Sequence, residues 1–157
     1  MSASDGAGPF AEGEKRAAFR DHAREQLGID EALIRRVVHT FYGAIRRDRL
    51  LGPIFDARIA DWPTHLERME AFWSSVMLMS GRYHGQPMVA HANLPIDSAH
   101  FDRWLRLFDE TVAATCDPPA AGAFRLRART IAESLELGVA ARHGRLLARG
   151  ERFSEPG

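Results

Sequence analysis

Apolar residues recur at intervals of three and four along four segments of this chain, and this spacing constrains the fold more than any other feature. In residues 30–48 the apolar positions are Leu33, Ile34, Val37, Val38, Phe41 and Ile45. Similar stripes occur in residues 61–80, 98–116 and 117–143. A repeat of 3.6 residues places such side chains on one face of a helix, whereas a half-buried strand alternates polar and apolar residues. The sequence has no alternating run of useful length, so we predict an all-α fold.

Residues that favour helix ends separate the four segments. The expected N-terminal caps are Asp30, Asp61, Asp97 or Ser98, and Asp117. Pro63 and Pro118 then fall in a first helical turn, where the missing N–H costs little. Gly81 is expected to end the second long helix, and the last long helix is expected to end around Gly144. The stretch from Leu51 to Ile59 is interpreted as a connector.

The length of 157 residues is that of a single domain. We expect residues 29–143 to form this domain, with residues 1–28 as a flexible N-terminal extension and residues 144–157 as a C-terminal tail. Within the extension, residues 13–27 are expected to form a short charged helix that ends at Gly28.

Composition excludes several classes of function. The formal net charge is zero, with 21 basic and 21 acidic residues, whereas binding of nucleic acid requires clustered positive charge. No apolar run reaches the length of a membrane span or resembles a signal peptide, so a cytoplasmic protein is expected. Cys116 is the only cysteine, which excludes an intramolecular disulfide and a cysteine-based zinc site.

The spacing of the helices predicts a slot with a histidine in it. Short connectors make the first two long helices spatial neighbours, and likewise the last two. Two such pairs stacked across one another leave a slot between them. Residues 82–96 join the pairs and contain Gly85, Pro87 and Pro95, which leave room for little more than two helical turns around His91. His91 can therefore point into the slot.

His91 is the candidate metal ligand. A single histidine near an apolar segment is more often a structural or surface residue, but here no carboxylate or cysteine neighbour indicates zinc. A neutral imidazole binds haem iron through one nitrogen, while the other needs a partner such as a backbone carbonyl. The carbonyl groups of Gln86, Pro87 and Met88 are candidates. The absence of a C-x-x-C-H motif predicts that any haem is held without thioether links.

Three further side chains are candidates for contact with a ligand on the iron. Tyr42 and Trp104 lie on apolar helix faces, where each is either an ordinary core residue or a hydrogen-bond donor to the ligand. His65 shares a face with Met69 and Phe72, and alone it would be interpreted as a surface histidine. The expected cofactor contacts are Phe55, Met69, Phe72, Arg82, Tyr83, His91 and Trp104. Arg82 and Tyr83, together with His84, are expected near the propionates.

In their order and spacing these residues resemble the truncated haemoglobins, and among them group III. The resemblance rests on Phe41-Tyr42, Leu51-Gly-Pro-Ile-Phe55, Trp62-Pro-Thr-His65, Phe72-Trp73, Gly85-Gln-Pro…His91 and Trp104-Leu-Arg-Leu-Phe108. It implies a two-over-two helical sandwich around haem b, with His91 as the proximal ligand. Tyr42, His65 and Trp104 would then be the distal residues, and Phe55 would pack on the haem.

The resemblance implies binding of O₂, NO or CO at a five-coordinate ferrous iron, in a monomer or weak oligomer. Several donors around one ligand favour slow release, which suits oxidation of nitric oxide, or a peroxidase-like reaction, better than oxygen transport. Turnover would need a separate reductase, because the chain has no flavin or nicotinamide motif. Two alternatives are a haem-based gas or redox sensor that acts through a protein partner, and a helical bundle without a cofactor.

Overall fold

The computed structural model describes residues 9–91 and 93–154, and these contain seven helices and no strand. The helices are α1 (Pro9–Leu27), α2 (Glu31–Arg47), α3 (Gly52–Arg58), α4 (Trp62–Leu78), α5 (Pro87–His91), α6 (Ser98–Thr115) and α7 (Pro118–Arg142). The all-α prediction is confirmed. Residues 1–8 of the expected flexible extension and residues 155–157 of the expected tail lie outside the described residues.

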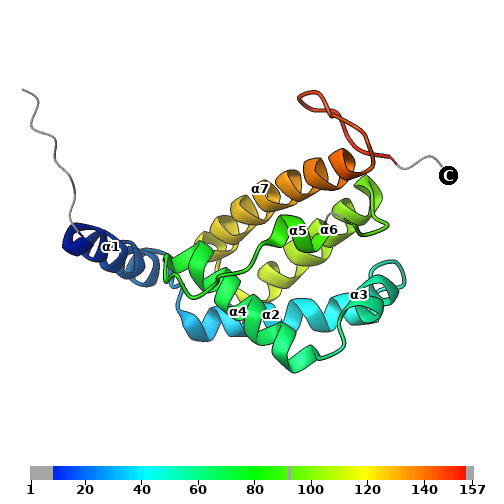
Figure 1. Cartoon of the computed structure of the whole chain (residues 1–157). Helices are drawn as coiled ribbons and strands as arrows, with labels where there is room; N and C mark the ends of the chain where they lie inside the picture. Colours follow the sequence, from blue (N-terminus) through cyan, green and yellow to red (C-terminus); the bar gives the residue numbers. More distant parts are fainter. Residues whose placement is uncertain (1–8, 92, 155–157) are drawn as a thin grey trace, which may run out of the picture.

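The four long helices of the sequence pattern form two layers. Helix α2 packs against α4, α6 packs against α7, and α2 also crosses α6 (Figure 1). Each layer thus contains two helices that are neighbours in the pattern, as the two-over-two arrangement requires. The short helix α5 lies against α7, so it approaches the space between the layers from the side of the second pair.

Most helix boundaries lie where the capping residues predict them. The Asp30 carboxylate accepts the Leu33 N–H at 2.9 Å, and Asp97 caps α6 in the same manner. Helix α4 differs, because it ends at Leu78, and Met79 rather than Gly81 takes the first left-handed conformation, with φ of 51°. The Ser75 hydroxyl then accepts the Tyr83 N–H at 2.9 Å, which ties the following loop to the last turn of α4.

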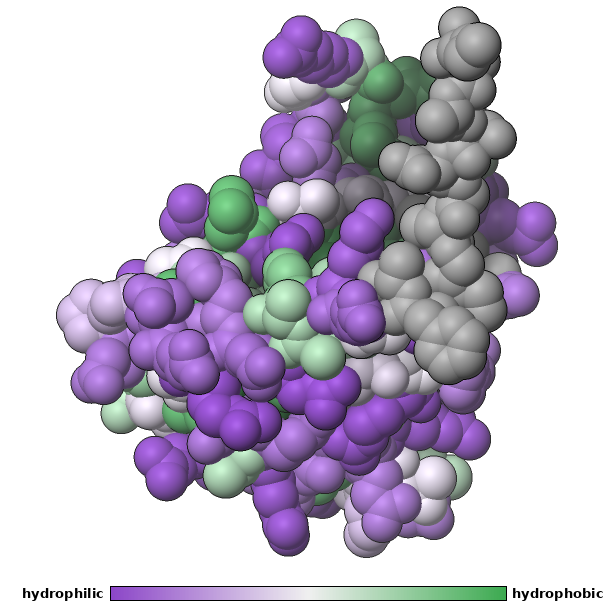
Figure 2. Space-filling model, turned by 90° about the vertical axis from the view of Figure 1, so that its left-hand side faces the viewer, coloured by the Kyte–Doolittle hydropathy of each residue, from purple (hydrophilic) through white to green (hydrophobic). Residues whose placement is uncertain are grey.

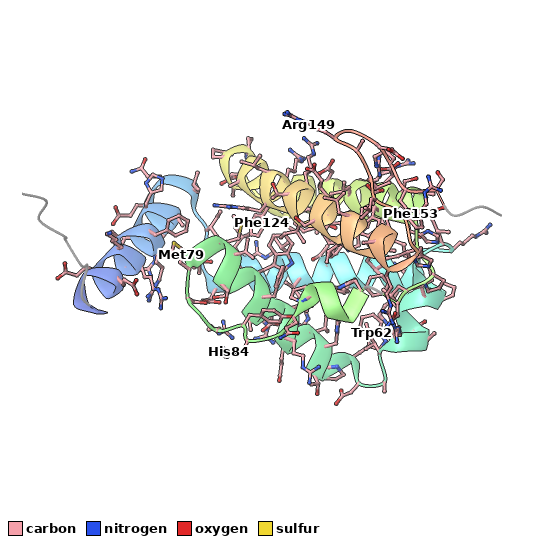
Figure 3. The ribbon with its side chains drawn as sticks, turned by 45° about the horizontal axis from the view of Figure 1, so that its top comes forward. Trp62, Met79, His84, Phe124, Arg149 and Phe153 are labelled. Atoms are coloured by element: carbon pink, nitrogen blue, oxygen red, sulfur yellow. The ribbon has the colours of Figure 1, made fainter. Side chains whose placement is uncertain are left out.

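The core is built around a stack of three aromatic rings. Phe108 is completely buried and lies between Trp73, at 5.0 Å and 18°, and Trp104, at 5.5 Å and 9°. Phe41 meets both Phe108 and Trp104 edge-on at 5.2 Å. Phe124 closes the stack from α7, and Figure 3 shows it directed from that helix towards the interior. Because the stack joins α2, α4, α6 and α7, burial of these rings holds the two layers together.

The connector that carries Phe55 forms a helix, α3, which the sequence pattern did not predict. Its start lies tightly against the end of α2, since a Cβ atom at Gly52 would lie 2.9 Å from the backbone oxygen of Arg46. Pro53 occupies the first turn, where proline is compatible with a helix. The close approach allows the Phe55 ring to meet the Tyr42 ring at 6.1 Å.

The predicted helix near the N-terminus is present as α1, although it begins at Pro9 and not at residue 13. It packs against α4 and α7, with Ala23 buried and Leu27 half-buried. Figure 2, viewed from the α1 end of the molecule, shows hydrophilic side chains over most of this face, with apolar ones in small separate groups. None of the described helices is long and apolar enough to cross a membrane.

The described part of the expected C-terminal tail folds back onto the domain. Phe153 is buried in a cluster with Phe101, Val139 and other apolar residues, and Figure 3 shows it beside the end of α7. Arg152 forms an ion pair with Glu136 at 2.9 Å. An apolar ring and a paired arginine are enough to anchor the segment, although the sequence alone indicates no helix or strand there.

Candidate functional site

A large cavity lies between the two layers of the described structure, and α2 to α7 all contribute to its wall. It contains about 1140 Å³ of space free of atoms, including its open mouth, and its lining is mainly apolar. Eight of the nine predicted site residues line it: Tyr42, Phe55, His65, Met69, Phe72, Tyr83, His91 and Trp104. An apolar cavity with a few polar groups in its wall is typical of a site for a small molecule or a cofactor.

His91 is oriented by its own helix. Its Nδ1 donates to the Pro87 carbonyl at 2.7 Å, one turn earlier in α5, as predicted for one of three candidate carbonyls. Burial lowers the pKa of His91, and this effect exceeds that of the hydrogen bond, which favours the charged form. The imidazole is therefore neutral at pH 7, and Nε2 is the nitrogen that remains available to a metal.

The loop before α5 brings Tyr83 to the cavity. The Tyr83 ring packs edge-on against Phe72 at 5.2 Å and lies so close to Gly85 that a Cβ atom there would collide with the phenol. A side chain at residue 85 would displace the ring from this position. The absence of a side chain at Gly85 therefore allows Tyr83 to form part of the cavity wall near His91.

Tyr42 lies deep in the cavity wall on α2. Its ring meets the His65 ring edge-on at 5.1 Å and the Phe55 ring at 6.1 Å. Burial raises the pKa of Tyr42 well above its ordinary value, and the neighbouring Tyr83 adds to the effect. The hydroxyl group is therefore protonated at neutral pH, so it can donate a hydrogen bond.

His65 has a buried nitrogen atom without a partner. The Asp61 carboxylate caps α4 by accepting the Thr64 N–H at 3.3 Å, and this places His65 in the first turns of that helix. Its Nε2 is buried and makes no hydrogen bond with any described residue. Burial lowers the pKa of His65, and electrostatic interactions with the neighbouring His91 and Arg68 act in the same direction. A buried polar atom without a partner is costly in a folded protein, so this atom is suited to contact a ligand bound in the cavity.

Trp104 is the third polar group of the cavity. Its indole stacks on Phe108 at 5.5 Å and is met edge-on by Phe41 at 5.2 Å, which restricts its orientation. The indole N–H can only donate. Tyr42, His65 and Trp104 come from α2, α4 and α6, so three helices direct polar groups at one apolar space.

The structure does not bring Arg82 to the cavity. Its Nη1 donates to Glu31 Oε2 at 2.8 Å, and Glu31 also accepts from the Ser74 hydroxyl. Arg82 therefore pairs with Glu31, the first residue of α2, and this contact holds the loop after α4. Arg68 lines the cavity instead. It lies three residues after His65 on the same face of α4, and this spacing is the signal that could have identified it.

Several residues of the cavity were not among the predicted contacts. They belong to the segment after α5 and to the second helix pair: Leu94, Ile96, His100, Phe101, Ile131 and Leu135. Phe101, Ile131 and Leu135 occur in the helical stripes of the sequence, but the pattern alone does not distinguish a core position from a cavity wall. Leu94 and Ile96 lie outside any periodic segment.

The chemistry of these residues fits haem. A neutral histidine with its second nitrogen anchored is suited to an axial position on iron, and the apolar walls suit a flat macrocycle. The unpartnered Nε2 of His65 lies in the same cavity. Hydrogen-bond donors such as the Tyr42 hydroxyl and the Trp104 indole N–H, in residues that line this cavity, are suited to a small electronegative ligand.

Comparisons with known proteins agree with this geometry. A family model described as bacterial-like globin matches residues 23–128. The group 3 truncated haemoglobin of Campylobacter jejuni is 31% identical over 113 residues, which are 69% of this chain and 89% of that protein. The crystal structure of group III truncated haemoglobin from Campylobacter jejuni matches with a TM-score of 0.66 and the same identity and coverage. The chain therefore belongs to the bacterial-like globin family, as a group III truncated haemoglobin, and this membership implies that it binds haem and a small gas ligand.

Proposed function

We propose that this protein binds haem b non-covalently through His91 and holds O₂, NO or CO against Tyr42, His65 and Trp104. One observation carries the proposal: a neutral, anchored His91 and the unpartnered Nε2 of His65 share a single cavity. The first group has a ring nitrogen suited to binding a metal, and the second is a buried polar atom that a ligand beside that metal would satisfy.

The other residues of the cavity wall would supply the remaining contacts with the haem. Phe55, Met69, Phe72 and Tyr83 supply apolar and aromatic surface for the macrocycle. The exposed Arg68 replaces Arg82 as the cation for a haem propionate, because Arg82 is engaged by Glu31. Arginine binds carboxylates in a bidentate manner, so Arg68 would hold a propionate at its part of the cavity wall.

The three polar groups retain the gas ligand. Tyr42 and Trp104 donate through O–H and N–H groups that packing holds in place. Such donors in a dry cavity stabilise a ligand that carries partial negative charge, as O₂ does and CO does not. Slow release of O₂ follows, and it favours reaction of the bound gas over transport.

We propose oxidation of nitric oxide as that reaction. Haem supplies its chemistry: NO and O₂ combine to give nitrate at the expense of one electron from ferrous iron, which a separate reductase must restore. The chain's own residues hold O₂ at the donors and exclude water with apolar walls. A peroxidase-like reaction would instead use a peroxide as the oxidant and take two electrons from an external reductase or another donor.

The absorption spectrum tests haem binding. We expect a Soret band in the wild type, which shifts after addition of dithionite and CO. His91→Ala should lose this band or weaken it strongly. His84→Ala is the matched control, because His84 lies on the same loop, is exposed and is outside the cavity, at the edge of the molecule in Figure 3. A colourless wild type that also fails to take up added haem would remove the proposal.

A pair of tyrosine variants tests the distal assignment. Tyr42→Phe should release O₂ about tenfold faster, because one hydrogen bond is worth roughly 1.5 kcal/mol. Tyr83→Phe removes the other hydroxyl that lines the same cavity and should leave the rate close to that of the wild type. Equal rates in both variants and the wild type would show that Tyr42 does not hold the ligand.

Mixing the O₂-loaded protein with nitric oxide tests the reaction itself. We expect ferric haem and one nitrate for each haem oxidised, at a rate close to that of encounter. If nitrate does not form, oxidation of nitric oxide is refuted. A partner protein whose affinity changes with ligation would then support the sensor, since linkage couples the two binding events.

A further inference from the structure

We propose that the C-terminal clamp, which we define as residues 145–154, positions the segment that holds His91. Arg152 and Phe153 are its positioning residues. The clamp acts on residues 93–97, the linker between α5 and α6. This proposal rests on the haem-binding role of His91, and its first test is independent of haem.

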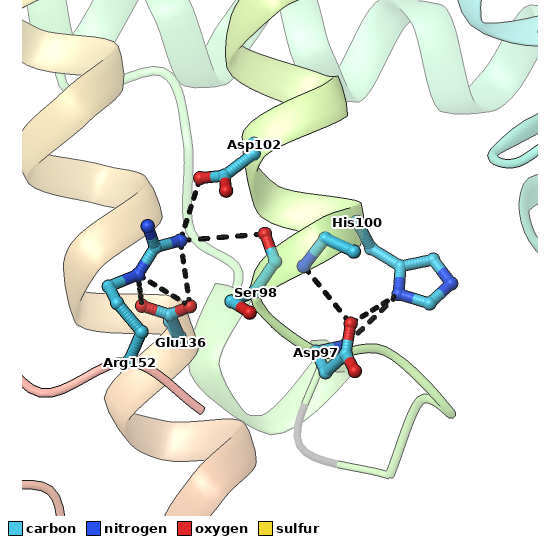
Figure 4. A network of polar contacts seen from close by, with 7 residues as sticks. Asp97, Ser98, His100, Asp102, Glu136 and Arg152 are labelled. Carbon is cyan, nitrogen blue, oxygen red and sulfur yellow. Dashed lines mark hydrogen bonds and ion pairs between the residues drawn. The ribbon is translucent and has the colours of Figure 1, made fainter. Parts of the chain in front are cut away.

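Arg152 anchors the clamp to two helices. Its guanidinium donates to both carboxylate oxygens of Glu136 on α7, at 2.9 and 3.1 Å from Nε, and to Asp102 on α6 at 2.8 Å (Figure 4). The same group approaches the Ser98 carbonyl at 3.4 Å. Glu136 is buried, and a buried carboxylate requires a paired cation. Arg152 therefore has a defined place at the junction of α6 and α7.

Phe153 brings the clamp onto the linker. Its ring is buried in one cluster with Leu94, Ile96 and Phe101. Its carbonyl accepts the Ser98 N–H at 2.7 Å. That N–H belongs to the first turn of α6 and has no partner within the helix. The clamp thus completes the start of α6 and covers the apolar side of the linker.

The linker transmits this contact to His91. The Leu94 N–H donates to the His91 carbonyl at 3.1 Å, and the Ile96 N–H donates to the Leu94 carbonyl at 2.9 Å. Arg142 also holds Asn93 at 2.9 Å, from the end of α7. Leu94 and Ile96 line the cavity and belong to the same buried cluster as Phe153. Leu94 therefore links this cluster directly to the backbone of His91 through one hydrogen bond.

The clamp lies outside the part of the chain that the family model matches. That match ends at residue 128, whereas Glu136, Arg152 and Phe153 all follow it. Pro87, which orients His91 from within α5, and Asp102, which pairs with Arg152, belong to the matched part. The clamp itself lies beyond it.

The first test uses amide hydrogen exchange in the protein without haem. Arg152→Gln and Phe153→Ala should each raise the exchange rates of Leu94 and Ile96 about tenfold relative to amides of α2, since the linker opens locally. Arg149→Gln is the matched control, because Arg149 lies on the same clamp but is exposed and points away from the domain in Figure 3. Equal acceleration in α2 and the linker would show a general loss of stability and would overturn the proposal, as would unchanged linker exchange.

The second test follows the haem-loaded protein. Arg152→Gln should shift or broaden the iron–histidine stretching band of the ferrous form and speed the transfer of haem to apomyoglobin, whereas Arg149→Gln should do neither. Arg152→Lys, which keeps the charge but lacks the planar fork, should be intermediate. An unchanged band would refute positioning of His91 even if the linker opens. If the wild type takes up no haem, the proposed function fails, and the exchange experiment still decides whether the clamp holds the linker.

Discussion

Removal of the Phe108 ring tests the view that the aromatic stack holds the two helix layers together. Phe108 is 0% exposed and has four aromatic neighbours, Phe41, Trp73, Trp104 and Phe124. Truncation of a buried phenylalanine to alanine costs about 3–5 kcal/mol. Because the ring is fully enclosed by helices that cannot collapse independently, we expect Phe108→Ala to lower the free energy of unfolding by about 4–5 kcal/mol.

Urea denaturation of the haem-free protein, followed by circular dichroism, measures this loss. The midpoint should fall while the slope with urea stays constant, and Tm should fall by roughly 8–20 °C, at about 2–4 °C for each kcal/mol. Phe108→Leu, which keeps most of the volume but loses the ring contacts, should cost about 1–2 kcal/mol. Leu126→Ala is the control, since Leu126 is 67% exposed and should change stability by less than about 0.5 kcal/mol.

A small loss of stability in Phe108→Ala would contradict this reasoning. If Phe108→Ala costs less than about 2 kcal/mol with an unchanged slope, the stack is not the main link between the layers, and the large loss expected for an enclosed ring is refuted. If Phe108→Leu costs as much as Phe108→Ala, the shape of the ring matters and its volume does not.

Three further predictions concern the ends of helices. Gly52→Ala should lower the free energy of unfolding by about 1–3 kcal/mol, because the new methyl group would lie 2.9 Å from the Arg46 oxygen; urea denaturation measures it, and an unchanged midpoint would contradict the close approach of α3. Met79→Gly should raise the free energy of unfolding by about 0.5–1 kcal/mol by relieving the left-handed conformation, and a lower Tm in calorimetry would show that the Met79 side chain matters more. Burial opposes the charge of Asp48, but hydrogen bonds from Arg103, Leu51 and Leu50 outweigh it and lower the pKa of Asp48. The stabilisation is therefore present above about pH 4 and is lost as the pH falls through the lowered pKa. Asp48→Asn should be less stable than the wild type at about pH 7 and approach it at low pH, and a constant difference between the two urea midpoints across that range would refute the role of the charge.

The fold was predictable wherever one residue type decides a boundary or a face. Asp30, Asp61 and Asp97 begin helices because a carboxylate accepts an N–H that has no partner in the first turn. The stripes that include Phe41 and Phe108 became the core because their spacing leaves them one face. The end of α4 was not predictable in the same way, since Met79 adopts a conformation that glycine usually takes.

The site was predictable in its apolar and hydrogen-bonding parts but not in its long charged side chains. His91 and Tyr42 are held by their own helices, so their positions follow from local spacing. The direction of an arginine depends on which carboxylate it meets, and Glu31, far away in the sequence, engages Arg82. The return of Phe153 to the domain likewise depends on contacts between distant segments, which no local pattern encodes.

The placement of the tryptophans gives the molecule an optical reporter. The chain has three tryptophans. Trp73 and Trp104 line the cavity, and Trp62 lies with its ring 5.7 Å from that of His65. An absorbing macrocycle in the cavity would therefore accept excitation energy from every indole, with no distant tryptophan left to emit unquenched. The intrinsic emission of the protein should thus measure the filled fraction of the pocket directly, without a label.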